Sequence, residues 1–156
     1  MIFVWDAATA ERKYFMTLPT GSVSVSALAL SPDGKYLVAS DMSDDYKMHL
    51  FDLTGELDKY DKCKRVCLWE EVEESNKKEI FGTSNKKQIF GRSNKKQIFG
   101  IRWNPSDYSE FVSVGDQHLY FWNVSKNAKK SVEVNVGFVA VAYNQSGTVF
   151  TAGSDG

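Results

Sequence analysis

The feature that most constrains this chain is a plan of strand, polar turn and strand that occurs three times. In each copy the second strand ends in small residues. The turn and second strand of the copies read SPDGKYLVAS (Ser31–Ser40), NPSDYSEFVSVG (Asn104–Gly115) and NQSGTVFTAG (Asn144–Gly153). The last two start 40 residues apart and the first two start 73 apart, a step that falls to 55 without two copies of a nine-residue repeat. Such steps indicate repeated structural units.

The apolar runs of the chain are short, rich in Val, Phe, Tyr and Leu, and separated by turn residues such as the PDG at 32–34. This pattern is typical of strands, and no strong amphipathic helix is present. The predicted strands are Ile2–Trp5, Val25–Ser31, Tyr36–Ser40, Met48–Leu53, Arg65–Glu71, Ile98–Trp103, Phe111–Gly115, His118–Val124, Ser131–Val136, Phe138–Tyr143 and Thr148–Gly153. The fold class is therefore all-β.

The strand that follows each of the first two copies ends in an aromatic residue and Asp or Asn, and the chain begins with one such ending. The pairs are Trp5-Asp6, Phe51-Asp52 and Trp122-Asn123. The aromatic side chain supplies a large buried area, and the polar residue starts the next turn. A single unit of this kind cannot bury both of its faces alone, so the units must stack.

The spacing matches the blade of a WD-type β-propeller, which is about 40–45 residues long. We predict WD40-type β-propeller blades, two nearly complete and partial ones at both ends, that do not close into a ring. Residues 1–53 hold the end of one blade plus a full one, and residues 98–156 hold a second blade and the start of a third. Between them, residues 54–97 form an enlarged charged loop with one outer strand near 65–71. Because propellers usually contain about four to eight blades, we expect a fragment of a longer protein.

Composition narrows the classes of function. The formal net charge is −1, which argues against nucleic acid and membrane surfaces as partners, because both attract a cationic excess. Cys63 and Cys67 are the only cysteines, too few for a four-ligand zinc site and consistent with a reducing compartment. The sequence contains no nucleophile elbow, phosphate-binding glycine loop or metalloprotease motif. We therefore expect no enzymatic activity, no cofactor and no metal.

A nine-residue unit is repeated almost three times between Ser75 and Gly100, as SNKKEIFGT, SNKKQIFGR and SNKKQIFG. One interpretation is a tandem duplication of a strand start, since the third copy runs directly into the strand IRW at 101–103. The other is a cationic loop that binds acidic partners through salt-dependent contacts. Its cations are Lys77, Lys78, Lys86, Lys87, Arg92, Lys95 and Lys96.

Two further features of this segment bear on binding. Trp69 lies beside four acidic residues and is the best candidate for a partly exposed interface aromatic. The pairs Ile80-Phe81 and Ile89-Phe90 have three possible fates: contact with a neighbouring surface, short added strands, or an exposed apolar patch prone to association.

The histidines are interpreted as structural. His118 follows a turn and precedes an inner strand, where it would join a buried hydrogen-bond network with Ser, Asp and Trp. We assign the same role to His49 in the preceding blade, with Asp45 nearby. Trp5, Trp69, Trp103 and Trp122 are expected to be mostly core. The proposed structural blade residues are Trp5, Asp6, His49, Phe51, Asp52, Trp103, His118 and Trp122.

Several stretches resemble the echinoderm microtubule-associated protein-like family. Residues 115–122, GDQHLYFW, follow the turn Trp103-Asn104-Pro105 and are similar to the G-x-x-H-[LI]-x-F-W segment of that family. Residues 151–156 resemble its T-G-D-S-x-G turn one blade later, residues 25–53 its preceding blade, and residues 1–6 the end of the blade before. The likeness covers most of the chain outside residues 54–97.

The resemblance implies a non-enzymatic fragment of the first propeller in that family. It also implies association with tubulin and microtubules, and a location in the cytoplasm and cytoskeleton that extends to the cilium or axoneme. The basic segment would then meet the glutamate-rich tails of tubulin. The alternative function is a generic WD-repeat scaffold subunit of another complex, without contact to tubulin.

Overall fold

The computed structural model describes residues 1–18, 22–42, 47–54, 69–71, 88–90, 96–126 and 128–155, the short ranges 69–71 and 88–90 by their backbone only. Every regular element in these ranges is a strand, which confirms the all-β prediction. In the same ranges, no helix has the length and apolar character needed to cross a membrane.

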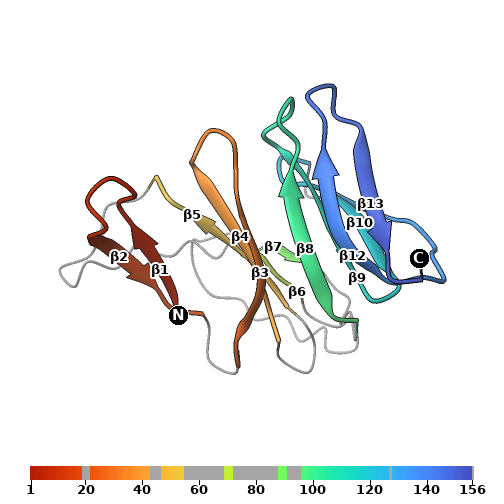
Figure 1. Ribbon diagram of the computed structural model, residues 1–156, viewed down its shortest axis with the longest axis horizontal. Coiled ribbons are helices and arrows are strands. Elements are labelled where there is room, and N and C mark those ends of the chain that lie inside the picture. The colour runs from red at the N-terminus through yellow and green to blue at the C-terminus, as the bar shows by residue number, and fades with distance from the viewer. Residues whose placement is uncertain are drawn as a thin grey trace.

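The strands form separate sheets that follow one another in chain order, from the N-terminus to the C-terminus (Figure 1). The strands are β1 (Ile2–Trp5), β2 (Arg12–Met16), β3 (Val25–Leu30), β4 (Tyr36–Asp41), β5 (Met48–Asp52), β6 (Trp69–Glu71), β7 (Gln88–Phe90), β8 (Ile98–Trp103), β9 (Glu110–Gly115), β10 (His118–Asn123), β11 (Ala128–Ser131), β12 (Phe138–Tyr143) and β13 (Val149–Gly153). We call β1–β2 the N-terminal sheet, β3–β4–β5 the first blade, β8–β9–β10–β11 the second blade and β12–β13 the C-terminal sheet. These four sheets are antiparallel, whereas β6 and β7 pair in parallel.

The repeated turns have a common construction. In the first blade, the hydroxyl of Ser31 donates to Asp33 over 2.6 Å, and Gly34 adopts a φ of 72°. In the C-terminal sheet, the side-chain oxygen of Asn144 accepts from the backbone N–H of Thr148 over 2.8 Å, and Gly147 adopts a φ of 82°. Glycine fits both positions because side chains disfavour this left-handed conformation.

Three apolar layers hold the sheets together. We call the face of a blade that is turned toward the preceding sheet its N-side face, and the opposite face its C-side face. The N-terminal sheet packs on the N-side face of the first blade through Ile2, Met16, Leu37, Ala39 and Phe51. The layer between the two blades includes Val38, Leu50, Trp103, Phe111 and Trp122. Val112, Val114 and Val141 form the layer between the second blade and the C-terminal sheet.

Burial follows from this stacking. Strands β4 and β9 are buried along nearly their whole length because a sheet covers each of their faces. This explains the almost continuous apolar character of their sequences. The arrangement confirms the prediction of two nearly complete blades with partial ones at both ends and no closed ring among the described residues.

Two strand predictions need correction. The strand predicted at 131–136 is instead β11, Ala128–Ser131, because these residues pair with β10 and the chain leaves the sheet after Val132 donates to Leu119. Strand β2 was not predicted, because its first residues Arg12 and Lys13 are exposed at an edge and do not extend the apolar pattern.

The inserted segment is described only in part. Strand β6 covers the end of the strand predicted at 65–71, and residues 65–68 lie outside the described ranges. Ile89 and Phe90 belong to β7, a short added strand, which was one of the alternatives for this pair. The pair Ile80-Phe81 lies outside the described residues.

Candidate interaction surface

Most of the sequence-predicted binding residues fall in the undescribed part of the chain. Lys77, Lys78, Lys86, Lys87, Arg92 and Lys95 lie outside the described residues, and Trp69 is described only by its backbone in β6. Lys96 is the member of this set whose side chain is placed. The cationic binding loop therefore remains a prediction, and only Lys96, at the C-terminal end of the basic set, has a described side chain.

Lys96 fixes the end of the basic segment to the second blade. Its Nζ donates to the backbone oxygen and to the side-chain oxygen of Gln117, over 3.0 and 3.2 Å. Gln117 has a φ of 46° and lies in the turn between β9 and β10. The approach is close, because a Cβ placed on Gly115 would lie 1.8 Å from the backbone oxygen of Gln97. The basic repeats thus enter the fold beside the β9–β10 turn.

The second blade contains a buried polar network on its N-side face. The hydroxyl of Ser113 lies 2.7 Å from Nε2 of His118 and accepts a hydrogen bond from Nε1 of Trp122 over 2.8 Å. All three side chains are buried. Burial lowers the pKa of His118 to about 3, and the positive charges of Lys129 and Lys96 act in the same direction. His118 is therefore neutral at physiological pH, and Ser113 bridges its ring to the indole.

The first blade contains a different buried pair. Nε2 of His49 lies 3.0 Å from the carboxylate of Asp41, and both residues are fully buried. The same carboxylate accepts hydrogen bonds from the hydroxyl of Ser22 and from the backbone N–H of Lys47. Asp41 is thus the acidic partner of His49. Asp45, which the sequence suggested, lies outside the described residues.

The register shows that the two histidines are not equivalent. Phe51 pairs with Leu37 in the first blade, and Trp122 pairs with Phe111 in the second. When β5 and β10 are aligned on these two aromatic residues, His49 corresponds to Tyr120. Tyr120 lies two residues after His118, on the same face of the strand. The prediction that they hold analogous positions is wrong, because the histidine lies two residues nearer the aromatic in β5 than in β10.

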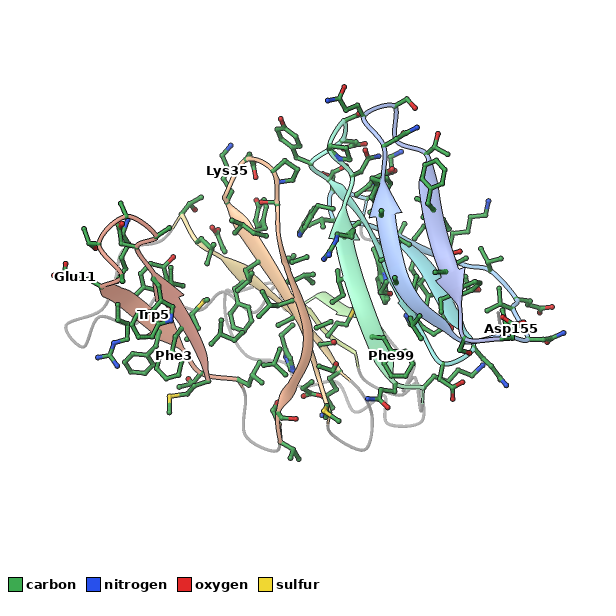
Figure 2. The ribbon with its side chains drawn as sticks, viewed as in Figure 1. Phe3, Trp5, Glu11, Lys35, Phe99 and Asp155 are labelled. Carbon is green, nitrogen blue, oxygen red and sulfur yellow. The ribbon has the colours of Figure 1, made fainter. Side chains whose placement is uncertain are left out.

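The aromatic residues near the ends of the strands differ in their surroundings. Phe51, Trp103 and Trp122 are buried, and the indole of Trp103 donates across the two blades to the backbone oxygen of Ala29 over 3.0 Å. Trp5, by contrast, is 59% exposed, so its assignment to the core is wrong. Figure 2 shows Phe3 and Trp5 on the N-terminal sheet, at the end of the molecule opposite Asp155. No sheet of the described residues covers this face.

The polar residue after each aromatic closes the following turn. Asp6 accepts from the backbone N–H groups of Ala8 and Thr9 and forms an ion pair with Lys13 at 2.9 Å. The Lys13 contact and these N–H groups lower the pKa of Asp6 to about 2. Asp52 and Asn123 accept from Thr54 and Lys126 in the same way.

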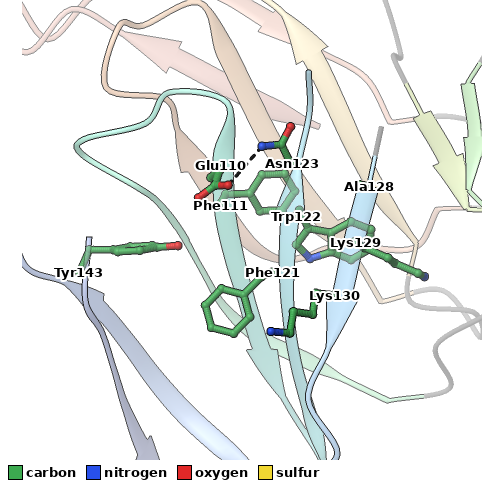
Figure 3. A pocket seen from close by; sticks show the side chains of 9 residues that line it. All are labelled: Glu110, Phe111, Phe121, Trp122, Asn123, Ala128, Lys129, Lys130 and Tyr143. Atoms are coloured by element: carbon green, nitrogen blue, oxygen red, sulfur yellow. Dashed lines mark hydrogen bonds between the residues drawn. The ribbon is translucent and has the colours of Figure 1, made fainter. Parts of the chain in front are cut away.

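A groove of about 400 Å³ opens between the second blade and the C-terminal sheet (Figure 3). Phe121 and Tyr143 face it from β10 and β12, and Lys130 borders it from β11. Glu110 accepts from the amide of Asn123 over 3.2 Å in the same wall. Burial and the Glu110 charge raise the pKa of Tyr143 to about 12, so its phenol stays neutral. The groove can hold an apolar side chain beneath a polar rim.

Sequence reasoning did not identify this groove or the partner of His49. Phe121 belongs to an apolar segment, which predicts that both faces of its strand are buried and not that one of them lines a groove. Tyr143 belongs to a different sheet. The stacking order alone brings them together. Asp41 ends a strand whose remaining residues are mostly apolar. An acidic residue at the end of such a strand is a sequence signal from which a buried partner for His49 could have been predicted. Among the described residues, no group of three or more potential ligands could hold a metal ion.

Comparison with known proteins supports the blade assignment. Residues 12–52 match the family described as WD domain, G-beta repeat. The chain is 26% identical over 161 residues to the ciliary WD repeat-containing protein ctxp80 of Euplotoides octocarinatus. That match covers 98% of this chain but only 18% of the relative. The chain therefore contains a WD40 repeat and spans a small part of this curated relative.

Solved propellers share the fold. The WD40 domain of Toxoplasma gondii coronin superposes with a TM-score of 0.58 and 18% identity, over 86% of this chain and 30% of that one. The β-propeller domain of Cps50 (Swd1) from Myceliophteria thermophila gives a TM-score of 0.61 and 15% identity, over 97% and 41%. These likenesses show WD40 β-propeller architecture. The finer resemblance to the echinoderm family remains a prediction.

Proposed function

We propose that this chain is a non-enzymatic binding module of the cytoskeleton that contacts tubulin in the microtubule lattice. The observation that carries the proposal is the match across 98% of the chain to a WD-repeat protein named as ciliary. The resemblance of residues 115–122 to the microtubule-associated family points in the same direction. Cytoplasm and cytoskeleton, including the cilium, are the locations that this function requires.

The geometry supports binding through rigid blades to which a charged segment is attached. The blades bury their histidines in hydrogen bonds to Ser113 and Asp41, so these groups serve stability. The basic repeats reach the second blade at Lys96, whose amino group is held beside the exposed turn at Gln117. A cationic segment fixed at one end to a rigid sheet can approach the acidic tails of tubulin while the blade keeps its shape.

Co-sedimentation with microtubules tests the proposal. The full chain is expected to pellet with microtubules at low ionic strength and to remain in the supernatant at high ionic strength, because contacts between exposed charges are screened by salt. Microtubules whose acidic tails have been removed by limited proteolysis are expected to bind it less. A chain that stays in the supernatant at both ionic strengths would contradict tubulin binding and leave the scaffold function in another complex.

A matched pair of variants locates the contact. The triple substitution Lys86→Gln, Lys87→Gln and Lys95→Gln removes three cations of the repeats and is expected to weaken binding at least tenfold at low salt. The control Lys13→Gln, Lys35→Gln and Lys126→Gln removes the same charge from exposed positions elsewhere and is expected to bind within about twofold of the parent. Equal losses in both variants would assign the binding to net charge and not to the repeats.

A further inference from the structure

The first strands of three successive sheets lie side by side and leave one edge open. β3, β8 and β12 each stand at one end of the pairing order of their sheet, and they are neighbours in space (Figure 1). We call the edge of β8 that faces away from β9 its inner edge. In a propeller such edges face the central channel. Because β8 lies between β3 and β12, described residues on both sides set the surroundings of this edge.

A groove of about 230 Å³ follows the inner edge of β8. It is lined by residues 27–28 of β3, 99–102 of β8 and 139–141 of β12. Sites for small organic ligands are usually larger, about 300–1,000 Å³. The groove therefore suits one or two side chains of an extended peptide better than a compact small molecule.

Arg102 is the one charged residue that lines this groove. It is exposed, and its Nη1 donates to the backbone oxygen of Ile101 over 3.0 Å. This hydrogen bond holds the guanidinium along the strand. No acidic side chain among the described residues forms an ion pair with Arg102. A guanidinium has five N–H donors, and the bond to Ile101 uses one, so donors remain for an acceptor in the groove.

Arginine at this position is particular to the second blade. The pairing registers of the three first strands place Ala29 of β3 and Ala142 of β12 at the position of Arg102. Alanine therefore satisfies the packing that this position needs. The longer cationic side chain gives the groove a charge that the stacking of the sheets does not require.

An aromatic residue on the same strand gives the groove an apolar part. A register shift before residue 100 leaves Phe99 as an extra residue in β8, as in a β-bulge. Phe99 is 40% exposed (Figure 2). The corresponding shifts in β3 and β12 leave Ser26 and Val139 as the extra residues. Val139 lines the groove together with Phe99, so apolar side chains lie on one side of Gly100 and Arg102 lies on the other.

We propose that this groove binds an extended peptide segment of a partner protein in which an Asp or Glu lies three residues from a large apolar side chain. The carboxylate accepts two parallel hydrogen bonds from Arg102, and the apolar side chain contacts Phe99 and Val139. Because Phe99 and Arg102 are three residues apart on one strand, the two contacts lie about 10 Å apart, which three residues of an extended peptide also span.

The charge of the groove favours a carboxylate over a phosphate. One cation matches one carboxylate, whereas a phosphorylated residue carries nearly two negative charges and is usually bound by several arginines. The site uses none of the basic repeats, so the proposal is independent of binding to tubulin.

Nuclear magnetic resonance on the full chain, labelled with nitrogen-15, tests the site. The probes are two short peptides, one containing Glu-Thr-Thr-Leu and the other Leu-Thr-Thr-Glu, which cover both chain directions. One of them is expected to shift the amide signals of β8 and the Nε–H signal of Arg102 in a saturable way, with a dissociation constant of about 1 mM or lower. The same peptide with Gln in place of Glu is expected to bind about tenfold more weakly, because it lacks the charged acceptor.

Two variants take residues that the first blade already has at the corresponding positions. Arg102→Ala copies Ala29 and Phe99→Ser copies Ser26, so both are expected to keep the fold, which circular dichroism checks. Arg102→Ala is expected to raise the dissociation constant of the Glu peptide about tenfold and to abolish its preference over the Gln peptide, and Phe99→Ser to raise it at least about threefold. The control Lys35→Ala removes an exposed cation from the first blade and is expected to bind within about twofold of the parent.

Three results would overturn the proposal. They are the lack of a saturable shift with either peptide, equal binding of the Glu and Gln peptides, and an Arg102→Ala variant that keeps the preference for Glu. A failure of microtubule co-sedimentation alone would not affect it, because the peptides are titrated without tubulin.

Discussion

The indole N–H of Trp122 donates to the hydroxyl of Ser113 over 2.8 Å, and the first blade has Phe51 and Ala39 at the corresponding positions. A buried indole N–H needs an acceptor, whereas a phenyl ring needs none. Donor and acceptor are therefore present together in one blade and absent together in the other. Because the aromatic residue and the residue that faces it differ together, each blade accommodates its own aromatic residue without leaving a buried N–H group unpaired.

Removing the acceptor is expected to destabilise the fold. Ser113→Ala deprives Trp122 and His118 of their Ser113 partner inside a buried face. The free energy of unfolding, measured by urea titration, is expected to fall by about 1–3 kcal/mol. The exposed Ser125→Ala is the control and is expected to change it by less than about 0.5 kcal/mol. Equal effects of the two substitutions would show that the Ser113 network adds nothing.

The double variant Ser113→Ala/Trp122→Phe reproduces the pair found in the first blade. It removes donor and acceptor together, so the loss is expected to be smaller than the sum of the two single losses. The difference, obtained from a double-mutant cycle, is expected to be about 0.5–3 kcal/mol. Strict additivity would contradict a direct interaction between the two side chains.

The stability of the fold is expected to depend on pH through His118. Its pKa is about 3 in the folded chain against an ordinary value of 6.5, so the unfolded chain binds more protons between these values. The contribution of His118 to the free energy of unfolding is therefore constant well above pH 6.5 and falls with decreasing pH, with a slope that approaches about 1.4 kcal/mol per pH unit.

The variant His118→Asn isolates this contribution from that of the carboxylates. Comparing the pH dependence of wild type and variant between pH 4.5 and 7 removes the effects that both share. The wild type is expected to lose more stability than the variant as the pH falls across this range. Parallel curves for the two proteins would mean that His118 titrates normally in the folded state.

The strands of this fold could be predicted from the sequence because two-sided burial leaves a direct signal. The sequences of β4 and β9 are mostly apolar. The polar turn before β4 begins with Ser31, and the one before β9 begins with Asn104. Strand β11 could not be placed by this reasoning. Its residues AKKS lie at an edge and are mostly exposed, and pairing with β10 rather than their own character makes them a strand.

The candidate surface was less predictable, because it depends on which sheet covers which face. Trp5 and Trp122 have the same local sequence pattern, yet one is exposed and the other buried, since a neighbouring blade covers only the second. His49 and His118 also look alike in sequence, and the register separates them by two residues. Such differences arise from contacts between distant segments, which a local pattern does not contain.

The buried carboxylate of Asp41 is expected to be essential for the first blade. Asp41→Ala removes the partner of His49 and two further hydrogen bonds, from Ser22 and Lys47. Breaking a buried pair of this kind costs about 3–5 kcal/mol. Thermal and urea unfolding are expected to show this loss, while Asp33→Ala, in a partly exposed turn, is expected to have a smaller effect. A loss as small as that of the control would mean that the Asp41 contacts contribute little to stability.

The close approach at Gly115 leads to a final prediction that separates crowding from backbone conformation. A Cβ at Gly115 would lie 1.8 Å from the backbone oxygen of Gln97, whereas a Cβ at Gly34, with a φ of 72°, meets nothing within 4 Å. Gly34→Ala is expected to cost only the strain of a left-handed residue, about 1–2 kcal/mol. Gly115→Ala must displace the strand start beside Lys96 and is expected to cost more and to raise amide hydrogen exchange in β8. Equal costs would show that residues 96–97 move away from the turn without penalty.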